Sequence, residues 1–186
     1  MFAATDVHYL PSDGARAALV LADDAAFSVI AAEKTVLVPH VAPYQPGEFF
    51  LRELPPLRSV LSGVTDLELL IIDGYVDLDP AGKAGLGAHA HTEFGVPVIG
   101  VAKTRFATAV HAVPVLRGQA TRPLYVTAAG VPVDRAADMV QAMTGKYRLP
   151  DALRQVDALA RGHVSATGDR LGPNSLNGLR RLSPYP

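Results

Sequence analysis

The segment Leu67–Gly74 constrains the fold of this chain more than any other feature. A near-continuous apolar run ends there in Asp73 and Gly74, and such a run predicts a central strand that is covered on both faces. A buried strand with a carboxylate at its carboxyl end is how many α/β folds place a metal ligand or a catalytic acid. A second acid, Asp6, lies in a strand predicted near the N-terminus. Two carboxylates on neighbouring strands favour a site.

Elements on either side of this run complete an α/β pattern. Apolar and β-branched runs predict strands over residues 2–9, 15–22, 27–38, 67–72, 96–102 and 124–127. Helical spacing of apolar residues predicts helices over residues 48–62, 85–94, 135–143 and 151–160. The pair Pro55-Pro56 predicts a kink or a break in the first helix, and Asp134 is expected to cap the third.

The order of these elements predicts one α/β domain with a ribonuclease H-like layout over residues 1–161. The first three strands, joined by short polar turns, read as an antiparallel meander, and the later strands alternate with helices as in parallel βαβ units. The expected result is a mixed central sheet flanked by helices on both faces. Gly, Pro, Ser and Asn dominate residues 162–186, which are expected to form an irregular tail.

Composition narrows the class of protein. With 186 residues, 49% of them hydrophobic, the chain can bury one full core. It has no cysteine, which excludes a disulfide and a thiolate zinc site. No signal peptide and no apolar stretch of membrane-spanning length is visible, so we expect a cytoplasmic protein with no membrane partner. The net charge of −1 argues against a strongly basic, non-specific nucleic-acid binder but not against a nuclease, because active-site acids offset a basic groove.

Four carboxylates that lie far apart in the sequence are candidates for one magnesium site: Asp6, Glu53, Asp73 and Asp157. Mg²⁺ prefers oxygen ligands and keeps several waters, so one or two carboxylates and a substrate phosphate suffice to hold it. Simpler readings stay open, because a strand-end acid can face water and Glu53 can form a surface pair with Arg52. An aspartate such as Asp157 is unfavourable in the middle of a helix between apolar neighbours, which indicates a functional role for it.

Three further features are candidates for a site. Lys103 ends a predicted buried strand and is suited to neutralise phosphate charge, unless it only emerges into solvent. His89 and His91 do not point together from a helix at that spacing, so a zinc site is not expected. The proline-stiffened loop 43–47 carries Tyr44, whose ring either stacks on a base or packs on the core.

Taken in order, these pieces resemble endonuclease V, the family of deaminated-base endonucleases directed at inosine. The matching stretches are residues 6–9, 43–47, 51–53, 72–74, 97–103, 122–126 and 148–151 with Asp157. Each stretch is short, but all of them occur in family order between the N-terminus and about residue 161.

The resemblance implies a ribonuclease H-like fold and cleavage of the second phosphodiester bond on the 3′ side of inosine in DNA or RNA. It implies a site for Mg²⁺, for which Mn²⁺ can substitute, made from Asp6, Glu53, Asp73 and Asp157, with Lys103 as the active-site lysine. It also implies a wedge that fills the gap left by a flipped base, and a tight pocket for that base. The residues at these positions are Tyr44, Gln45, Pro46, Gly47, Gly74 and His89.

The chain departs from the family pattern beside the substrate channel. Gln45 replaces an apolar wedge residue, and after Gly74 the family continues with glycine and basic residues, whereas residues 75–82 here carry Asp77 and Asp79. The stretch that begins at Thr127 lacks the family's histidine. Two other functions therefore stay open: a related protein that binds nucleic acid or a nucleotide without cutting it, and a metal hydrolase for a smaller phosphoester. We expect a monomer.

Overall fold

The structure, a computed structural model, describes residues 1–45 and 48–163 of the 186-residue chain. The strands are β1 (Phe2–Tyr9), β2 (Ala15–Ala22), β3 (Ile30–Val38), β4 (Leu69–Asp73), β5 (Val98–Ala102), β6 (Val113–Val115) and β7 (Leu124–Ala129). The helices are α1 (Phe50–Leu61), α2 (Leu86–Phe94), α3 (Val133–Ala142) and α4 (Asp151–Ala160). Within the described residues, no helix is long and apolar enough to cross a membrane. From residue 164 on, the tail expected over 162–186 lies outside the described residues.

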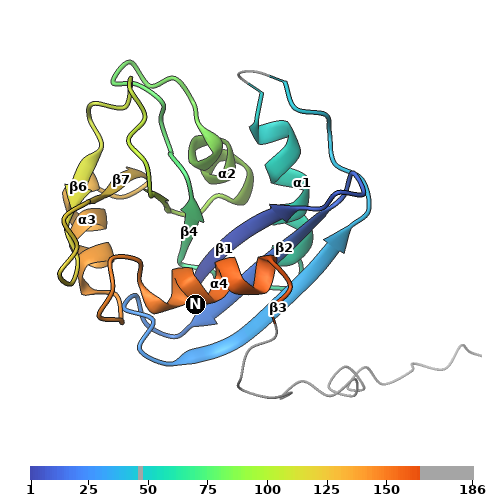
Figure 1. The fold of residues 1–186 in the computed structure, drawn as a ribbon, viewed down its shortest axis with the longest axis horizontal. Coiled ribbons are helices and arrows are strands. Elements are labelled where there is room, and N and C mark those ends of the chain that lie inside the picture. Colours follow the sequence, from blue (N-terminus) through green and yellow to red (C-terminus); the bar gives the residue numbers. More distant parts are fainter. Residues whose placement is uncertain (46–47, 164–186) are drawn as a thin grey trace, which may run out of the picture.

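The strands form one mixed sheet in the order β3-β2-β1-β4-β5-β7-β6 (Figure 1). β1, β2 and β3 make an antiparallel meander, whereas β1, β4 and β5 run parallel to one another. β7 and β6 extend the sheet with antiparallel pairing. The prediction of a meander that leads into parallel strands is confirmed.

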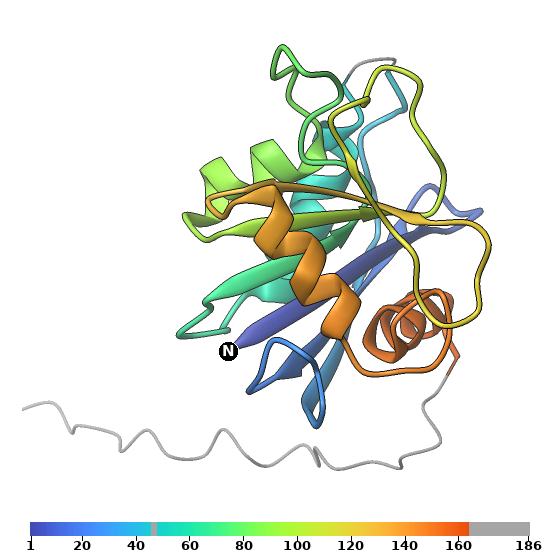
Figure 2. The ribbon, with the colours of Figure 1, turned by 90° about the vertical axis from the view of Figure 1, so that its left-hand side faces the viewer.

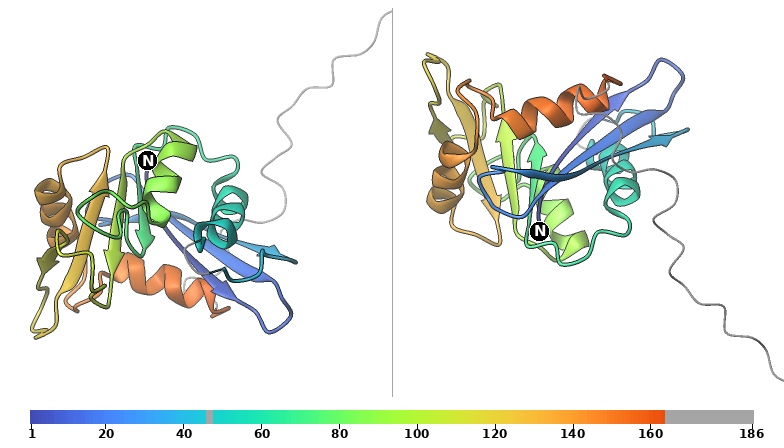
Figure 3. Two further views of the ribbon diagram at one scale, coloured as in Figure 1. Left: turned by 90° about the horizontal axis from the view of Figure 1, so that it is seen from above. Right: turned by 90° about the horizontal axis from the view of Figure 1, so that it is seen from below.

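Helices cover both faces of this sheet, as the two views of Figure 3 show. α1 and α2 pack on one face and α3 and α4 on the other, each over its own apolar core. In Figure 2, α3 crosses in front of the sheet and α4 is seen end-on. Along β4, Leu70 and Ile72 join the core under α1 and α2, while Leu69 and Ile71 join the core under α3 and α4. Burial on both faces explains why this segment is almost uniformly apolar.

The alternation of side chains along three strands determines the face on which the candidate site opens. Three core residues lie on the α3–α4 face: Ala4, Ile71 and Val101. Two positions further along the chain from each of them come Asp6, Asp73 and Lys103. Because side chains two residues apart in a strand share a face, these polar groups also turn toward α4, which packs against β1 and β2.

Two predicted elements differ in extent from the structure. β3 begins at Ile30, because Phe27 has a φ of 53°, which a strand does not accommodate. α1 continues without a break through Pro55 and Pro56. The two prolines remove backbone donors from the helix, and burial of Pro56 and the following apolar residues against the sheet offsets that loss.

Two further differences concern the segment after β5. The short strand β6 has no clear sequence signal, because Pro114 is the middle of its three residues; proline is tolerated there because β6 is an edge strand. α3 begins at Val133 with Pro132 in the N-cap position, so the prediction that Asp134 caps this helix is wrong. Asp134 instead lies in the first turn, where its negative charge interacts favourably with the helix dipole.

Candidate active site

Three carboxylates converge just beyond the point where the parallel pairing of β1 with β4 ends, at Thr5 and Ile72. Asp6 belongs to β1, Asp73 ends β4, and Asp157 comes from α4 above them. One oxygen atom from each of the three lies within 4.8 Å of the other two. Within the described residues this is the one group of three or more side chains arranged to hold a metal ion. Strands β1 and β4 are parallel neighbours, which accounts for the meeting of two acids 67 positions apart.

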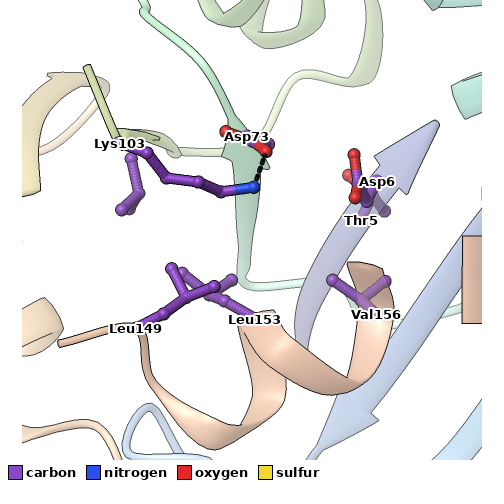
Figure 4. Close-up of a pocket in the computed structure, with 8 residues that line it drawn as sticks. Thr5, Asp6, Asp73, Lys103, Leu149, Leu153 and Val156 are labelled. Carbon is purple, nitrogen blue, oxygen red and sulfur yellow. Dashed lines mark ion pairs between the residues drawn. The ribbon is translucent and has the colours of Figure 1, made fainter. Parts of the chain in front are cut away.

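The ammonium group of Lys103 lies beside two of these acids. Its Nζ atom is 2.7 Å from Asp73 Oδ2, the contact drawn in Figure 4, and 3.5 Å from Asp157 Oδ1. Burial alone would lower the pKa of Lys103, but the hydrogen bond and charge of Asp73 outweigh it, and the pKa is raised. Lys103 therefore stays positively charged next to the carboxylates.

Asp6 is the acid of this cluster whose charge is least well compensated. Burial raises its pKa to about 7, and the nearby charge of Asp73 adds to the increase. A hydrogen bond of 2.8 Å from the Val7 N–H to Asp6 Oδ1 acts in the opposite direction. A cation bound at the cluster would bring the pKa of Asp6 down and keep this carboxylate ionised near neutral pH.

Asp157 has a second cationic partner, Arg161, one turn further along α4. Arg161 Nε donates to Asp157 Oδ2 at 3.0 Å and Nη2 donates to Oδ1 at 3.3 Å. Burial would raise the pKa of Asp157, but Arg161 and Lys103 lower it below its usual range. The i, i+4 spacing of Asp157 and Arg161 is the sequence signal by which this pair could have been predicted.

Glu53 reaches the site from α1, on the other face of the sheet, and it stays outside the three-carboxylate cluster. Its side chain is buried, with 6% exposure, so the reading of Glu53 as a surface partner of Arg52 is wrong. The Tyr9 hydroxyl donates to Glu53 Oε1 at 2.6 Å, and the Arg52 guanidinium lies 4.1 Å from the centre of the Tyr9 ring. Burial raises the pKa of Glu53 to about 7, with Asp6 adding and Tyr9 opposing. No sequence pattern singled out Tyr9 for this contact.

A small cavity lies between Asp6 and Asp73 of the strands and the apolar side chains of α4, and Figure 4 shows its walls. Its volume is about 10 Å³, room for about one water molecule. The polar wall contains Asp6, Asp73 and Lys103. The apolar wall is formed by side chains at and before α4, including Leu149, Leu153 and Val156. A cavity of this size accommodates an ion or a water, so a nucleotide would have to bind at the open edge of the cluster.

The residues expected to contact a base lie in three different places. Tyr44 is 62% exposed, so the alternative that it packs on the core is wrong. Gln45 is also exposed, while Pro46 and Gly47 lie outside the described residues. Gly74 directly follows Asp73, and its N–H donates to the Val101 carbonyl at 3.2 Å.

The two histidines of α2 have separate partners. The His89 ring stacks on Phe50 of α1, with ring centroids 3.7 Å apart, and His89 is not among the residues lining the cavity. His91 Nδ1 lies 2.6 Å from the Val96 carbonyl oxygen. The two rings are therefore held by different neighbours.

The chemistry of the cluster suits a hard divalent cation. Asp6, Asp73 and Asp157 offer oxygen ligands and neither nitrogen nor sulfur, which is the preference of Mg²⁺ and Mn²⁺. Burial and the neighbouring charge of Asp73 raise the pKa of Asp6, and a bound cation would oppose both effects. The donor set therefore fits a metal ion, which would compete with the Lys103 ammonium for Asp73 and Asp157.

A mixed sheet in this strand order, with helices on both faces, is a ribonuclease H-like fold, and the acids of β1, β4 and α4 meet beside it. The sequence model of the endonuclease V family matches residues 1–158. The chain belongs to the endonuclease V family, whose members are metal-dependent endonucleases. The predicted family and fold class are confirmed.

Individual relatives agree with this assignment. Endonuclease V of Azotobacter vinelandii is 33% identical over 183 aligned positions, covering 86% of this chain and 81% of the relative. The crystal structure of endonuclease V from Streptomyces avermitilis has 31% identity and a TM-score of 0.73, covering 86% of this chain and 79% of that one. Ciona intestinalis endonuclease V, in complex with a 24mer DNA containing an inosine followed by a ribo-adenosine, has a TM-score of 0.74 and 19% identity over 86% and 83% of the two chains. At that identity the likeness concerns the fold.

Proposed function

We propose that this chain is a Mg²⁺-dependent endonuclease that cleaves the second phosphodiester bond 3′ to inosine in DNA or RNA, in nucleic-acid repair. The observation that carries the proposal is the convergence of Asp6, Asp73 and Asp157 within 4.8 Å beside Lys103. Membership of the endonuclease V family supports the reaction. The solved relative in complex with inosine-containing DNA supports the class of substrate.

Each side chain of the site has a role in this proposal. Asp6 and Asp73 are the core metal ligands, and Asp157 completes the set. Glu53, held at a distance by its hydrogen bond from Tyr9, positions water or serves as an outer ligand. When bound, Mg²⁺ polarises the phosphate and makes a water molecule more acidic.

Lys103 is proposed to stabilise the charge that builds up on the phosphate. Its contact with Asp73 is short, at 2.7 Å, whereas its contact with Asp157 is 3.5 Å. A phosphate oxygen can therefore replace Asp157 as the second partner of Nζ while Asp73 keeps the ammonium in place. An ammonium already held at the site costs little reorganisation when charge develops in the transition state.

The base would be recognised at the edge of the sheet next to Asp73. We assign Tyr44, Gln45, Pro46 and Gly47 to the wedge, because the first two are exposed. Gly74 has a φ of 134°, a conformation that favours glycine, and it is proposed to line the base pocket beside Asp73. His89 is proposed to line the base pocket, with its ring oriented by the stack on Phe50. These residue roles follow the family resemblance.

A nucleic-acid-binding protein that does not cut remains the second candidate. One observation favours it: the Lys103 ammonium already pairs with Asp73 and Asp157, so a metal ion has to compete with an internal cation. The acidic loop after Gly74 gives it less support than its composition suggests. Asp79 Oδ1 accepts hydrogen bonds from the N–H groups of Ala81 and Lys83, so this acid shapes its own turn.

The deciding experiment is cleavage of end-labelled oligonucleotides that each contain one inosine, as single- and double-stranded DNA and as RNA, with Mg²⁺ or Mn²⁺. We expect a cut one nucleotide beyond the inosine and none in the matched adenosine oligonucleotides. Calorimetric titration with Mg²⁺ runs in parallel. A folded protein that binds no Mg²⁺ and cuts no oligonucleotide would support the binder, and cleavage restricted to bis(p-nitrophenyl) phosphate would support a hydrolase of small phosphoesters.

A further inference from the structure

The side chain of Tyr75 links the loop after β4 to the loop after β5. Its hydroxyl donates to the Thr104 carbonyl at 2.8 Å and accepts from the Phe106 N–H at 3.0 Å. The Phe106 ring lies against it, with ring centroids 6.0 Å apart. Both hydrogen-bonding functions of one hydroxyl thus act on the short segment Thr104–Phe106, which directly follows Lys103.

Arg148 contacts the main chain at Lys103, directly before this segment. Its Nη2 atom donates to the carbonyl of Lys103 itself and, at 2.7 Å, to the carbonyl of Pro123. Arg148 lies in the loop that leads into α4, whereas Tyr75 lies between β4 and α2. Two side chains from distant parts of the chain therefore meet at consecutive carbonyls, those of Lys103 and Thr104.

Lys103 needs such support because it lies one residue beyond the end of β5. The pairing of β5 with β7 ends at Ala102, so ladder hydrogen bonds do not order the main chain of Lys103. A lysine has a long side chain with considerable rotamer freedom. If its main chain also moved, the ammonium would not stay within 2.7 Å of Asp73.

We propose that Tyr75 and Arg148 are positioning residues, which fix the main chain at residues 103–106 and so hold the Lys103 ammonium at Asp73. The catalytic part of this proposal rests on the function proposed above. Positioning matters there because a displacement of about 1 Å in a reacting group can lower a rate by roughly 100-fold.

The substitution Tyr75→Phe tests the proposal by removing the hydroxyl while keeping the ring. Amide hydrogen exchange measures the hydrogen bond between the Phe106 N–H and the Tyr75 hydroxyl. The protection factor of the Phe106 amide should fall roughly tenfold, because the acceptor of this hydrogen bond is removed. The Val76 amide is an internal control, since it donates to the buried Thr127 Oγ1 at 2.8 Å. Tyr147→Phe, on a ring that is 50% exposed, is the matched control for loss of a tyrosine hydroxyl.

The effect on Lys103 is measured without substrate or metal. Modification by trinitrobenzenesulfonate, mapped to Lys103 by mass spectrometry, should be several-fold faster in Tyr75→Phe and in Arg148→Gln than in the wild type or in Tyr147→Phe. Arg148→Lys should be intermediate, because it keeps a cationic donor but loses the planar guanidinium group. Unchanged reactivity of Lys103 in a variant whose Phe106 amide has lost protection would overturn the proposal, since the segment would then move without moving the lysine.

Kinetics separate this proposal from the proposed function. With inosine oligonucleotides, Tyr75→Phe should lower kcat roughly tenfold and leave KM within about twofold, because the lysine acts on the reacting phosphate. A reversed pattern, with KM raised and kcat unchanged, would contradict the positioning role. If the wild type cuts nothing while exchange and lysine reactivity change as expected, the proposed function fails and the positioning of Lys103 stands.

Discussion

The candidate site takes its carboxylates from both faces of the sheet, and the two sides are built differently. On the α3–α4 face, Asp73 and Asp157 share the ammonium of Lys103, and Arg161 also holds Asp157. On the α1–α2 face, Glu53 is buried and receives its short hydrogen bond from a neutral hydroxyl. Cations therefore pair with Asp73 and Asp157 on the first side, whereas burial raises the pKa of Glu53 on the second side, as it also does for Asp6. The difference suggests a preformed metal cluster with a buried acid that ionises when a cation arrives.

The largest effect is expected from Asp73→Asn, which removes a proposed metal ligand of the three-carboxylate cluster. Cleavage should fall by at least about 10³-fold, because the metal loses a charged ligand and Lys103 loses its nearest partner. Circular dichroism and thermal unfolding should show an intact fold. Asp138→Asn, at an exposed acid of α3, is the matched control. Cleavage by Asp73→Asn at the wild-type rate would remove this residue from the site.

Glu53→Gln should have a smaller effect, on the order of 10- to 100-fold on cleavage. Glutamine can still accept the Tyr9 hydrogen bond, so the buried position keeps its partner. The Mg²⁺ concentration for half-maximal activity should rise, while calorimetry still detects the ion bound by the three-carboxylate cluster. Loss of all metal binding in this variant would mean that the two sides are not distinct and that Glu53 is a primary ligand.

The third prediction concerns the pH dependence of stability without metal. Asp6 has a pKa of about 7 in the folded chain, against an ordinary value of 3.8, so the folded state holds more protons between these values. Its contribution to the free energy of unfolding is therefore largest at low pH and is lost as pH rises toward 7 and above. Asp73 and Asp157 add to this effect, and Lys103 opposes it.

Asp6→Asn isolates this contribution from those of other groups. In EDTA, the variant should match the wild type near pH 4 and be more stable by about 1–2 kcal/mol near pH 8. Added Mg²⁺ should raise the Tm of the wild type more at pH 8 than at pH 5.5, and should do little for Asp6→Asn. A wild type that is more stable than the variant at pH 8 in EDTA would show that Asp6 is not strained by burial.

The positions of Asp6, Asp73 and Lys103 on the α3–α4 face could be predicted from the sequence far better than the surroundings of Glu53 on the α1–α2 face. The run that ends at Asp73 fixes a central strand, and period-two alternation turns Asp6, Asp73 and Lys103 to one face. The contact of Tyr9 with Glu53 joins residues 44 positions apart through side chains alone, and periodicity carries no information on it. The continuity of α1 through two prolines likewise depends on burial against the sheet, which local propensity does not contain.

The smallest effect is expected from Arg161→Gln, which tests whether Arg161 and Lys103 can replace each other as cationic partners of Asp157. Arg161 is half-exposed, so solvent screens its pairing with Asp157, and Lys103 keeps a contact with the same carboxylate. Cleavage should fall only about two- to fivefold, with the loss growing at low Mg²⁺ because Asp157 is then held less firmly. Arg154→Gln, which removes an arginine paired with Asp151 on the same helix, is the matched control. A loss as large as that of Asp73→Asn would instead mean that Arg161 contacts the substrate directly, so that α4 contributes a phosphate-binding group as well as a metal ligand.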